Sequence, residues 1–452
     1  APLRREDFYR HYWENQAVVI KRGDRSYFEG WLDVSEMKGF IERHGMRYGE
    51  DLDVTNYVNG RRVTLNPPPT RYCSSLPASL HSPANGEAAM VNAKFVWARF
   101  GEGCSLRMPC PQKFSDSMHR LLSSLEEEFG CMVGSNVYLT PAGHQGFAPH
   151  WDDVEAFLCQ VQGVKLWRIY RPRTESEVLP RVSSKNFSEK DLQTEPDLEV
   201  RLEPGDVLYL PRGWIHQAKT LGSEASLHVT LSCMQANCWA DFVERLLPEA
   251  IRSATQKLRS LRQGLPRDYL DYMGVMNAED ESETTVAHFA STLRAHLEAI
   301  MEEAMEMLDA MADQMGRRFM SDRLPPPLTP QEEQVTAGGQ SDAQITPLTQ
   351  LRMVRAGAAR LVVEEGKAVV YHCMDNARVH HGVPQSPLEF ELDDASAIEA
   401  LLRAYPAAVA VRDLPLGSDD IEDKVAIAVS LFKEGFLAVV DFDEEDCSSY
   451  GG

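Results

Sequence analysis

The hydrophobic and polar positions of the chain follow three different patterns in turn. In the N-terminal part, residues 17–21 and 95–99 are typical of strands, and the Pro- and Ser-rich stretch from Asn66 to about Glu87 is typical of a loop. From 131 to 235, short β-branched and aromatic runs alternate with turn signals, which predicts a sandwich or a jelly-roll barrel. From about residue 241, apolar residues recur at spacings of three and four, which indicates helices.

Within the barrel region, two apolar runs flank the pair Gln162-Gly163. These runs cover residues 154–161 and 164–170, so the pattern predicts a hairpin with a two-residue turn. Further strands are expected at 206–210, 214–220 and 227–232.

Two helices are predicted after the barrel, over Asp241–Arg262 and Thr284–Met320. The second has an apolar stripe made of Leu293, Leu297, Ile300, Ala304, Leu308, Met311 and Met315. This stripe could be intramolecular core or a self-association face, because a surface so rich in Leu and Met needs to be covered. Three prolines at 325–327 end the helix, and residues 328–344 have the composition of a linker.

The C-terminal region begins at Ile345 and mixes strands with helices, in an arrangement small enough for a winged helix. Strands are expected at 361–363, 368–372 and 436–440, and helices at 395–404 and 419–433. Residues 345–452 contain nine basic and nineteen acidic residues, with acids concentrated at 419–423 and 441–446. Because contacts to phosphates need cations, we expect this domain to bind no duplex DNA and instead to pack on a dimer or attract a basic protein.

Composition narrows the class of protein further. The net charge is −22, which disfavours general nucleic-acid binding, and no apolar run approaches the ~20 residues of a membrane span. No secretory signal pattern is present at the start, although the chain begins at Ala1 and an N-terminal extension with a targeting signal stays open. The nine cysteines include no C-x-x-C pair, which argues against a disulfide framework or a structural zinc site and favours a reducing compartment.

Three residues have the types and spacing of a metal site. His150 and Asp152 alternate in GFAPHWDD, so on a strand they would share one face. His216 follows Asp152 by 64 residues, directly behind the turn Pro211-Arg212-Gly213. Two His and one carboxylate leave three coordination positions open, and such a set is typical of Fe(II) oxygen chemistry. A non-enzymatic cupin-like barrel is the alternative.

Lys165 lies thirteen residues beyond Asp152, on a strand expected to pair with the strand of the metal ligands. From there its ammonium could reach the distal carboxylate of 2-oxoglutarate, or it could point to solvent. Polar residues at strand periodicity also predict a polar-lined barrel interior, with satisfied core polar groups as the alternative. These residues are Asn136, Tyr138, His228 and Ser232.

The run from Gly134 to Arg173 resembles the jumonji-C dioxygenase core and, more narrowly, the ribosomal-oxygenase branch. The resemblance covers nearly the whole chain, with further matching stretches at 57–68, 103–115, 202–218 and 264–274. It implies an α+β chain whose jumonji-C double-stranded β-helix barrel, with an N-terminal elaboration, covers residues 1–240. The expected remainder is a helical dimerisation domain at 241–324, a linker at 325–344 and an acidic winged-helix-like domain at 345–452.

Roles for individual residues follow from the resemblance. It implies that Fe(II) is bound by His150, Asp152 and His216, the catalytic residues. It assigns the 2-oxoglutarate pocket to Lys165, Asn136, His228 and Ser232. It makes Arg107 and Tyr138 candidates for contacting the substrate.

The implied reaction consumes O₂ and 2-oxoglutarate and hydroxylates a histidine, at the β-carbon, in a large-subunit ribosomal protein. A histone H3 lysine demethylase on the same scaffold is the first alternative, and a non-enzymatic scaffold is the second. The implied partners are a basic protein substrate and a second copy of the chain, in a homodimer or a larger homo-oligomer. The implied location is the nucleus, including the nucleolus and the nucleoplasm.

Overall fold

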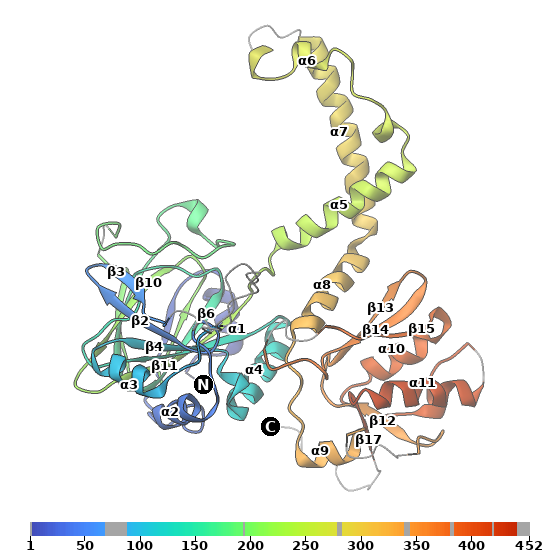
Figure 1. Cartoon of the computed structure of the whole chain (residues 1–452). Helices are drawn as coiled ribbons and strands as arrows, with labels where there is room; N and C mark the ends of the chain where they lie inside the picture. The colour runs from blue at the N-terminus through green and yellow to red at the C-terminus, as the bar shows by residue number, and fades with distance from the viewer. Residues whose placement is uncertain are drawn as a thin grey trace, which may run out of the picture.

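The structure is a computed structural model that describes residues 2–67, 88–192, 195–277, 283–338, 344–379, 384–417 and 420–440. It consists of a barrel, a projecting helical arm and a C-terminal α/β domain (Figure 1). Most of the loop expected between Asn66 and Glu87 lies outside the described residues, as do Asp419 and the acidic run 441–446. None of the described helices has the length and apolar character needed to cross a membrane.

The barrel is formed by two facing sheets of antiparallel strands. Its strands are β1 (Val18–Ile20), β2 (Asp53–Val58), β3 (Arg61–Thr64), β4 (Ser105–Pro109), β5 (Gly134–Thr140), β6 (Glu155–Gln162), β7 (Val164–Tyr170), β8 (Leu198–Leu202), β9 (Val207–Leu210), β10 (Ile215–Leu221) and β11 (Ser226–Cys233). The larger sheet has the order β1-β9-β6-β11-β5-β4-β2-β3 and the smaller sheet the order β10-β7-β8. Trp167 and Ile169 of the smaller sheet share a core with Leu158 and Leu208 of the larger one. The predicted jelly-roll barrel is therefore confirmed.

Helices cover the outer face of the larger sheet. They are α1 (Arg5–His11), α2 (Val34–Arg43), α3 (Ala93–Gly101) and α4 (Asp116–Phe129). Strand β11 shows how the strand period divides the two faces. Leu227 and Val229 are buried in the outer core with Leu122 of α4, whereas His228 and Thr230 line the interior of the barrel.

The prediction of a hairpin around Gln162-Gly163 is wrong. Strand β6 pairs with β9 and β11, and β7 pairs with β8 and β10, so the turn joins the two sheets rather than two neighbouring strands. Gly163 has a φ of +68°, and a Cβ at this position would lie 2.3 Å from the carbonyl oxygen of Ala225. Only a glycine fits this corner, where the chain passes closely over its neighbour.

The strand expected at 95–99 is also wrong, because these residues belong to helix α3. The side chain of Asn92 accepts a hydrogen bond from the backbone N–H of Phe95 and caps the helix. Val96 points into the outer core, and the aromatic residues around it pack at the edge of that core. Local capping and packing therefore override the β propensity of this run.

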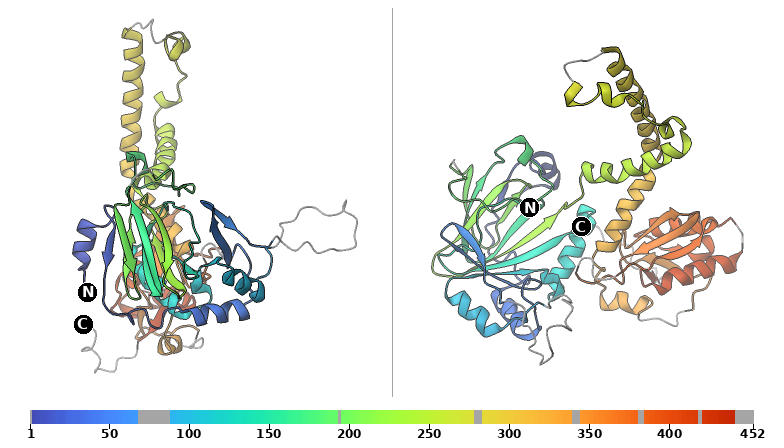
Figure 2. Two further views of the ribbon diagram at one scale, coloured as in Figure 1. Left: turned by 90° about the vertical axis from the view of Figure 1, so that its left-hand side faces the viewer. Right: turned by 45° about the horizontal axis from the view of Figure 1, so that its top comes forward.

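The arm projects from the body of the molecule, as Figure 2 shows. It consists of α5 (Trp239–Lys257), the short α6 (Tyr269–Tyr272), α7 (Glu283–Glu306) and α8 (Leu308–Asp322). The single helix expected over 284–320 is thus divided at Met307, which packs with Phe242 and Ile300 against the core of the arm. That core consists of Leu246, Ala250, Ala304 and Met311.

The apolar stripe of the arm is divided between this core and solvent. Ile300 and Ala304 face α5, whereas Leu293 and Leu297 are 48% and 51% exposed. The large apolar residues of α5 and α7 that are exposed are Trp239, Val243, Leu247, Ile251, Leu293, Leu297, Met301 and Met305. Part of the stripe therefore belongs to the intramolecular core, and another part is exposed and available for self-association.

The described part of the C-terminal domain has two small sheets and three α-helices. Its strands are β12 (Gln350–Met353), β13 (Ala359–Glu364), β14 (Lys367–His372), β15 (Leu388–Glu391), β16 (Val409–Ala410) and β17 (Leu437–Val439), and its helices are α9 (Pro330–Val335), α10 (Ala395–Arg403) and α11 (Ile421–Lys433). The sheets have the orders β16-β12-β17 and β13-β14-β15. Ile398 of α10 and Leu431 of α11 meet Leu437 in one core.

The expected linker at 325–344 is not a plain linker in its described part. Thr329 and Glu332 form a capping box that starts α9. Glu332 also pairs with Arg355, and Val335 packs against the core of the C-terminal domain. This segment therefore belongs to the domain that follows it.

The barrel and the C-terminal domain meet at the end of α8. Leu324 is buried in the outer core of the barrel, while Arg323 donates a 3.0 Å hydrogen bond to the carbonyl oxygen of Ala356 in the C-terminal domain. The carboxylate of Glu126, which is fully buried on α4, accepts hydrogen bonds from the N–H groups of Leu324 at 2.8 Å and Val133 at 3.3 Å. Glu126 thus connects the barrel to the segment that leads into the second domain.

Replacing Glu126 with Ala should loosen this junction. The substitution leaves two buried N–H groups without an acceptor, and each unsatisfied group costs about 1–3 kcal/mol. We expect a lower thermal unfolding midpoint and faster proteolysis near residue 325. Glu127→Ala is the matched control, because Glu127 makes only a partly exposed 3.6 Å ion pair with Arg323. Equal stability of the two variants would contradict the role given to Glu126.

Candidate functional site

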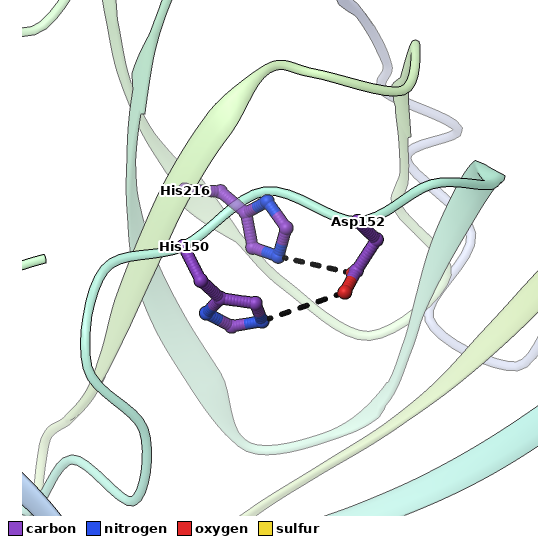
Figure 3. Close-up of side chains that lie close together, drawn as sticks. All are labelled: His150, Asp152 and His216. Atoms are coloured by element: carbon purple, nitrogen blue, oxygen red, sulfur yellow. Dashed lines mark ion pairs between the residues drawn. The ribbon is translucent and has the colours of Figure 1, made fainter. Parts of the chain in front are cut away.

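The three predicted metal ligands lie together at one end of the barrel. Figure 3 shows the imidazoles of His150 and His216 both facing the carboxylate of Asp152. The Nε2 atoms of the two histidines lie 3.8 Å and 3.7 Å from the carboxylate oxygens. The ligand atoms of all three residues lie within 4.8 Å of one another, a spacing that suits a single metal ion.

The backbone that carries these ligands differs from the expected strand. His150 pairs with β10 at one point only, where the His150 and His216 backbones exchange two hydrogen bonds of 3.3 Å and 2.9 Å. Residues 151–152 then leave the ladder. Gly213 donates a backbone hydrogen bond of 3.2 Å to the carbonyl oxygen of Asp152, so the turn before β10 also holds the carboxylate ligand in place.

Both imidazoles are prepared to coordinate through Nε2. The Nδ1 atom of His150 lies 2.8 Å from the carbonyl oxygen of Ala148, and that of His216 lies 3.0 Å from the carbonyl oxygen of Trp214. A carbonyl oxygen only accepts, so each Nδ1 carries the proton and each Nε2 has a lone pair for a metal. Burial lowers the pKa of His216 to about 4, with His150 contributing in the same direction and Asp152 opposing it. His216 is therefore neutral near pH 7, as metal binding requires.

A network of buried charged residues connects the two backbone segments that carry the metal ligands. Arg212, in the turn before β10, forms ion pairs with Glu155 and Glu14, and Tyr209 donates a hydrogen bond to Glu155. Glu155 begins β6, three residues after Asp152, and is fully buried. Sequence reasoning missed this residue. An acid that starts an apolar strand, next to a predicted ligand, was the available signal.

A cavity of about 60 Å³ connects the metal ligands to the barrel interior. Its lining consists of Tyr138, Thr140, Gly146, Phe147, Ala148, His150, Asp152, Ala156, Leu158, Lys165, Trp167, His216, Gln217, Ala218, His228 and Thr230. The metal ligands and Lys165 therefore line the same cavity.

Lys165 is a buried cation, only 4% exposed. Its Nζ lies 3.2 Å from Thr140 Oγ1 and 3.2 Å from His228 Nδ1, and no carboxylate of the described residues lies within 4.0 Å of it. Burial lowers the pKa of Lys165 to about 7, and burial together with the Lys165 charge lowers the pKa of His228 well below its usual value. A buried ammonium without a counterion is costly, so this end of the cavity favours an anionic ligand.

The position of Lys165 differs from the expected one. Strand β7 pairs with β10, which places Lys165 opposite Thr220 and Ile169 opposite His216. Lys165 thus lies on the strand next to His216, and not next to the segment of His150 and Asp152. Lys165 nevertheless lines the same cavity as the three metal ligands.

Of the other residues predicted for the 2-oxoglutarate pocket, one lines the cavity and two do not. His228 lines the cavity and stacks on Tyr138 with a ring distance of 4.9 Å, but Asn136 and Ser232 do not line it. Asn136 lies opposite Thr230, and Ser232 lies opposite Ala156 of β6, so the cross-strand neighbours of both residues line the cavity. The lining includes Thr140 and Thr230 instead. Thr140 was missed, although it continues the alternation of Asn136 and Tyr138.

The two candidate substrate contacts lie side by side on neighbouring strands. Arg107 of β4 is paired with Tyr138 of β5, and the Arg107 guanidinium forms a 3.2 Å ion pair with Asp53. Tyr138 lines the cavity, whereas Arg107 does not. Arg62 lies close by, with its guanidinium 4.3 Å from the centre of the Phe147 ring.

Comparisons with known proteins agree with this architecture. Residues 107–242 match the family model described as the JmjC domain, and residues 324–440 match that of the C-terminal winged helix domain of ribosomal oxygenase 1. The chain is 42% identical to ribosomal oxygenase 1 of Rattus norvegicus over 448 residues, which cover 97% of this chain and 71% of the rat protein. The chain belongs to the ribosomal oxygenase family. The expected fold and family are thereby confirmed.

Other relatives of this ribosomal oxygenase are similar over the same region. Ribosomal oxygenase 1 of Homo sapiens is 41% identical over 97% of this chain and 66% of its own length. The bifunctional lysine-specific demethylase and histidyl-hydroxylase NO66 of Aedes aegypti is 37% identical over 96% of this chain and 66% of its own length. The solved X-ray structure of E. coli ycfD is 16% identical, with a TM-score of 0.49 over 97% of this chain and 98% of its own.

Family membership and the site together define the enzyme class. This ribosomal oxygenase is a 2-oxoglutarate-dependent dioxygenase that uses Fe(II), 2-oxoglutarate and O₂. The donor set fits Fe(II), because two imidazole nitrogens and one carboxylate converge on one point and leave coordination positions open. The alternative of a non-enzymatic scaffold is set aside by the same findings.

Replacing His216 with Ala should abolish succinate formation while leaving the protein folded. The substitution removes one of three protein ligands, and changes in outer-shell partners alone cost about 10- to 100-fold in metal affinity or activity. Asp153→Ala is the matched control, because the Asp153 carboxylate binds Ser183 and Gln235 and is not one of the three converging ligands. Undiminished succinate production by His216→Ala would refute the assignment, provided that circular dichroism shows a native fold.

Proposed function

We propose that this ribosomal oxygenase hydroxylates a histidine side chain of a basic large-subunit ribosomal protein, at the β-carbon. Lys165 carries the proposal, because a buried cation without a counterion beside a two-His, one-carboxylate set calls for a dianionic cosubstrate. The name of the Aedes aegypti relative, which includes histidyl-hydroxylase, supports the choice of reaction. The net charge of −22 supports a basic substrate.

Each part of the cavity has a task in this proposal. His150, Asp152 and His216 hold Fe(II), which when bound supplies the O₂ activation that converts a C–H bond to C–OH while 2-oxoglutarate becomes succinate and CO₂. Lys165 and Thr140 bind the distal carboxylate of 2-oxoglutarate, and His228, held neutral by its surroundings, accepts a hydrogen bond from the ammonium.

The walls of the cavity orient the reactants and exclude water. Trp167 and Tyr138 flank His228 on two sides, with ring distances of 5.3 Å and 4.9 Å, so the cosubstrate end is closed by aromatic surface. Burial raises the pKa of Tyr138 to about 12, so its hydroxyl keeps a proton to donate to a substrate. We assign Tyr138 and Arg107 to substrate contact, and Asn136 and Ser232 to support of the pocket through their neighbours Thr230 and Ala156.

Lysine demethylation is the second candidate, because two relatives are named as lysine-specific demethylases, and we take histone H3 as its expected substrate. A methylammonium group needs an accessible aromatic face. The face of Phe147, which borders the cavity, is already covered by the guanidinium of Arg62. This contact favours histidine over methyl-lysine as the target. Location in the nucleus, including the nucleolus and nucleoplasm, follows as part of the same proposal.

Mass spectrometry of ribosomal proteins distinguishes the two reactions. After incubation with the enzyme, Fe(II) and 2-oxoglutarate, we expect the mass of one oxygen atom to be added to a histidine of one basic ribosomal protein. His216→Ala under the same conditions is the control. Release of formaldehyde from a methylated histone H3 peptide, without histidine hydroxylation, would select the demethylase instead.

Replacing Lys165 with Ala should weaken 2-oxoglutarate binding by about 10- to 150-fold, since a hydrogen bond to a charged group contributes about 1.5–3 kcal/mol. Lys219→Ala is the control, because Lys219 lies on the neighbouring strand β10 but is exposed. The measurement is the 2-oxoglutarate concentration that gives half-maximal succinate formation. Equal values for wild type and Lys165→Ala would show that another group binds the cosubstrate.

The affinity for 2-oxoglutarate should also fall as the pH rises above about 7. The pKa of Lys165 is lowered to about 7 in the cosubstrate-free protein, so above this pH a growing fraction of the ammonium is neutral and must take up a proton to bind a carboxylate. Calorimetry in two buffers with different ionisation heats should detect this proton uptake near pH 8. Lys165→Ala should show none, and uptake that persists in the variant would refute the linkage.

We further propose that a second copy of the chain covers the exposed apolar face of the arm. Replacing Leu293 and Leu297 with Glu should give a monomer by light scattering, because these residues are half exposed and do not belong to the arm's own core. Ile300 is unsuitable for this test because it packs inside the arm. Val182→Glu, at a residue that is 72% exposed on the barrel, is the control. A wild-type chain that is monomeric at micromolar concentration would contradict the proposal.

The C-terminal domain remains predicted not to bind duplex DNA. Its described acidic residues include Asp420, which caps α11, and Glu422 and Asp423 in the first turn of that helix. These carboxylates suit the helix dipole and would repel a phosphate.

A further inference from the structure

A second group of potential metal ligands lies in the C-terminal domain, away from the barrel. His372 is the last residue of β14, Asp375 follows three residues later, and Glu434 is the C-cap residue of α11. The ligand atoms of these three residues lie within 4.8 Å of one another, and His372 Nε2 is 3.5 Å from a carboxylate oxygen of Glu434. These separations are as short as those within the catalytic set.

The imidazole of His372 is buried but makes no hydrogen bond. Its residue is 5% exposed, and within the described part of the chain neither ring nitrogen has a hydrogen-bond partner. The other histidines buried to this degree are each satisfied: His119 by the carbonyl of Pro325, His216 by that of Trp214 and His228 by Lys165. A buried polar group without a partner is uncommon and calls for an explanation, such as an ion that is bound there.

The surroundings of His372 direct its ring toward the two carboxylates. The ring packs on Phe436, with 5.6 Å between the ring centres, so one side of the imidazole is held by apolar contact. Nε2 faces Glu434. Asp375 and Glu434 also border an open hollow between α9 and the end of α11, together with Glu333 and Met374. Water can therefore reach the group and complete a coordination shell.

The local electrostatics favour a cation. Glu434 lies at the C-terminal end of the 13-residue helix α11, where the helix dipole is negative, and residues 345–452 carry an excess of ten acidic residues. Lys433 borders the same hollow but is exposed, so its ammonium can extend into water. A protonated His372 paired with Glu434 would account for one short distance, but it would leave the second ring nitrogen and the convergence of Asp375 without explanation.

We propose that His372, Asp375 and Glu434 bind a divalent zinc ion that ties the end of β14 to the end of α11. One imidazole nitrogen and two carboxylate oxygens suit Zn²⁺, whereas an all-oxygen site would suit Mg²⁺ or Ca²⁺. The site is separate from the catalytic centre and its role is structural, so it does not depend on the reaction proposed for the barrel. Zinc there would hold the turn after β14 against α11.

The test uses the full chain with His150→Ala and His216→Ala, so that the catalytic centre contributes no metal binding. After treatment with a chelator, this variant is titrated with ZnCl₂ by calorimetry, and bound zinc is counted by elemental analysis after gel filtration. We expect one zinc ion per chain. Absence of bound zinc at micromolar ZnCl₂ in the folded variant would overturn the proposal.

Further substitutions in the same background locate the ion. His372→Asn combined with Glu434→Gln should lower zinc affinity by at least about 100-fold, since changes in outer-shell groups alone cost about 10- to 100-fold. Glu391→Gln, which removes an exposed carboxylate opposite Lys367 at the far end of β14, should leave zinc binding unchanged. Undiminished binding by the His372/Glu434 variant would refute the assignment.

A second measurement covers the case in which the His372 variant does not fold. Glu434→Gln and Asp375→Asn change partly or fully exposed side chains, so both should fold. Zinc should raise the thermal unfolding midpoint of the parent chain but not of these two variants. An equal rise in all three would place the ion elsewhere. Because every variant lacks catalytic ligands, none of these outcomes depends on the barrel reaction.

Discussion

The catalytic centre depends on two backbone hydrogen bonds between His150 and His216. They are the only ladder contact between the segment of Asp152 and strand β10 in the described chain, and they join two residues that lie 66 positions apart in the sequence. The backbone hydrogen bond from Gly213 to Asp152 and the buried pair of Arg212 with Glu155 then hold the segment in position. Ligands placed by backbone contacts are pre-organised, so metal binding does not have to order them.

Charge in the interior favours an anionic ligand in the cavity. Burial separates Lys165 from water, and the neighbouring groups are a hydroxyl and a neutral imidazole, neither of which neutralises its charge. The protein thus keeps a cation that a carboxylate can satisfy, on the strand next to His216. His216 and Lys165 lie on the paired strands β10 and β7, so the position of this metal ligand relative to the ammonium follows from one register.

The domains are connected by polar contacts from short segments. Glu126 binds the backbone of Leu324, His119 binds the carbonyl of Pro325, and Arg323 binds the backbone of the C-terminal domain. All three contacts involve residues 323–325, which directly follow α8. The arm, in contrast, keeps an exposed apolar face on α5 and α7, a surface that is suited to a partner rather than to the rest of the chain.

The sequence by itself determined the chemistry of the site and the order of the parts. The types and spacing of His150, Asp152 and His216 indicated iron, because few other residue sets leave three positions open on one metal. The change from strand to helical periodicity placed the barrel before the arm. Long matching motifs indicated the family. These features are local or depend on residue type, and they can be recognised without knowing the fold.

Only the tertiary structure decided which strands are neighbours and which polar residues reach the cavity. Alternation shows which face of a strand a residue occupies but not whether its side chain lines the cavity, since Asn136 and Thr230 lie opposite each other and only Thr230 does so. Local turn signals could not show that β6 and β7 belong to different sheets, because strand pairing is set by contacts distant in sequence. For the same reason, Ile300 and Leu297 of one stripe have different surroundings.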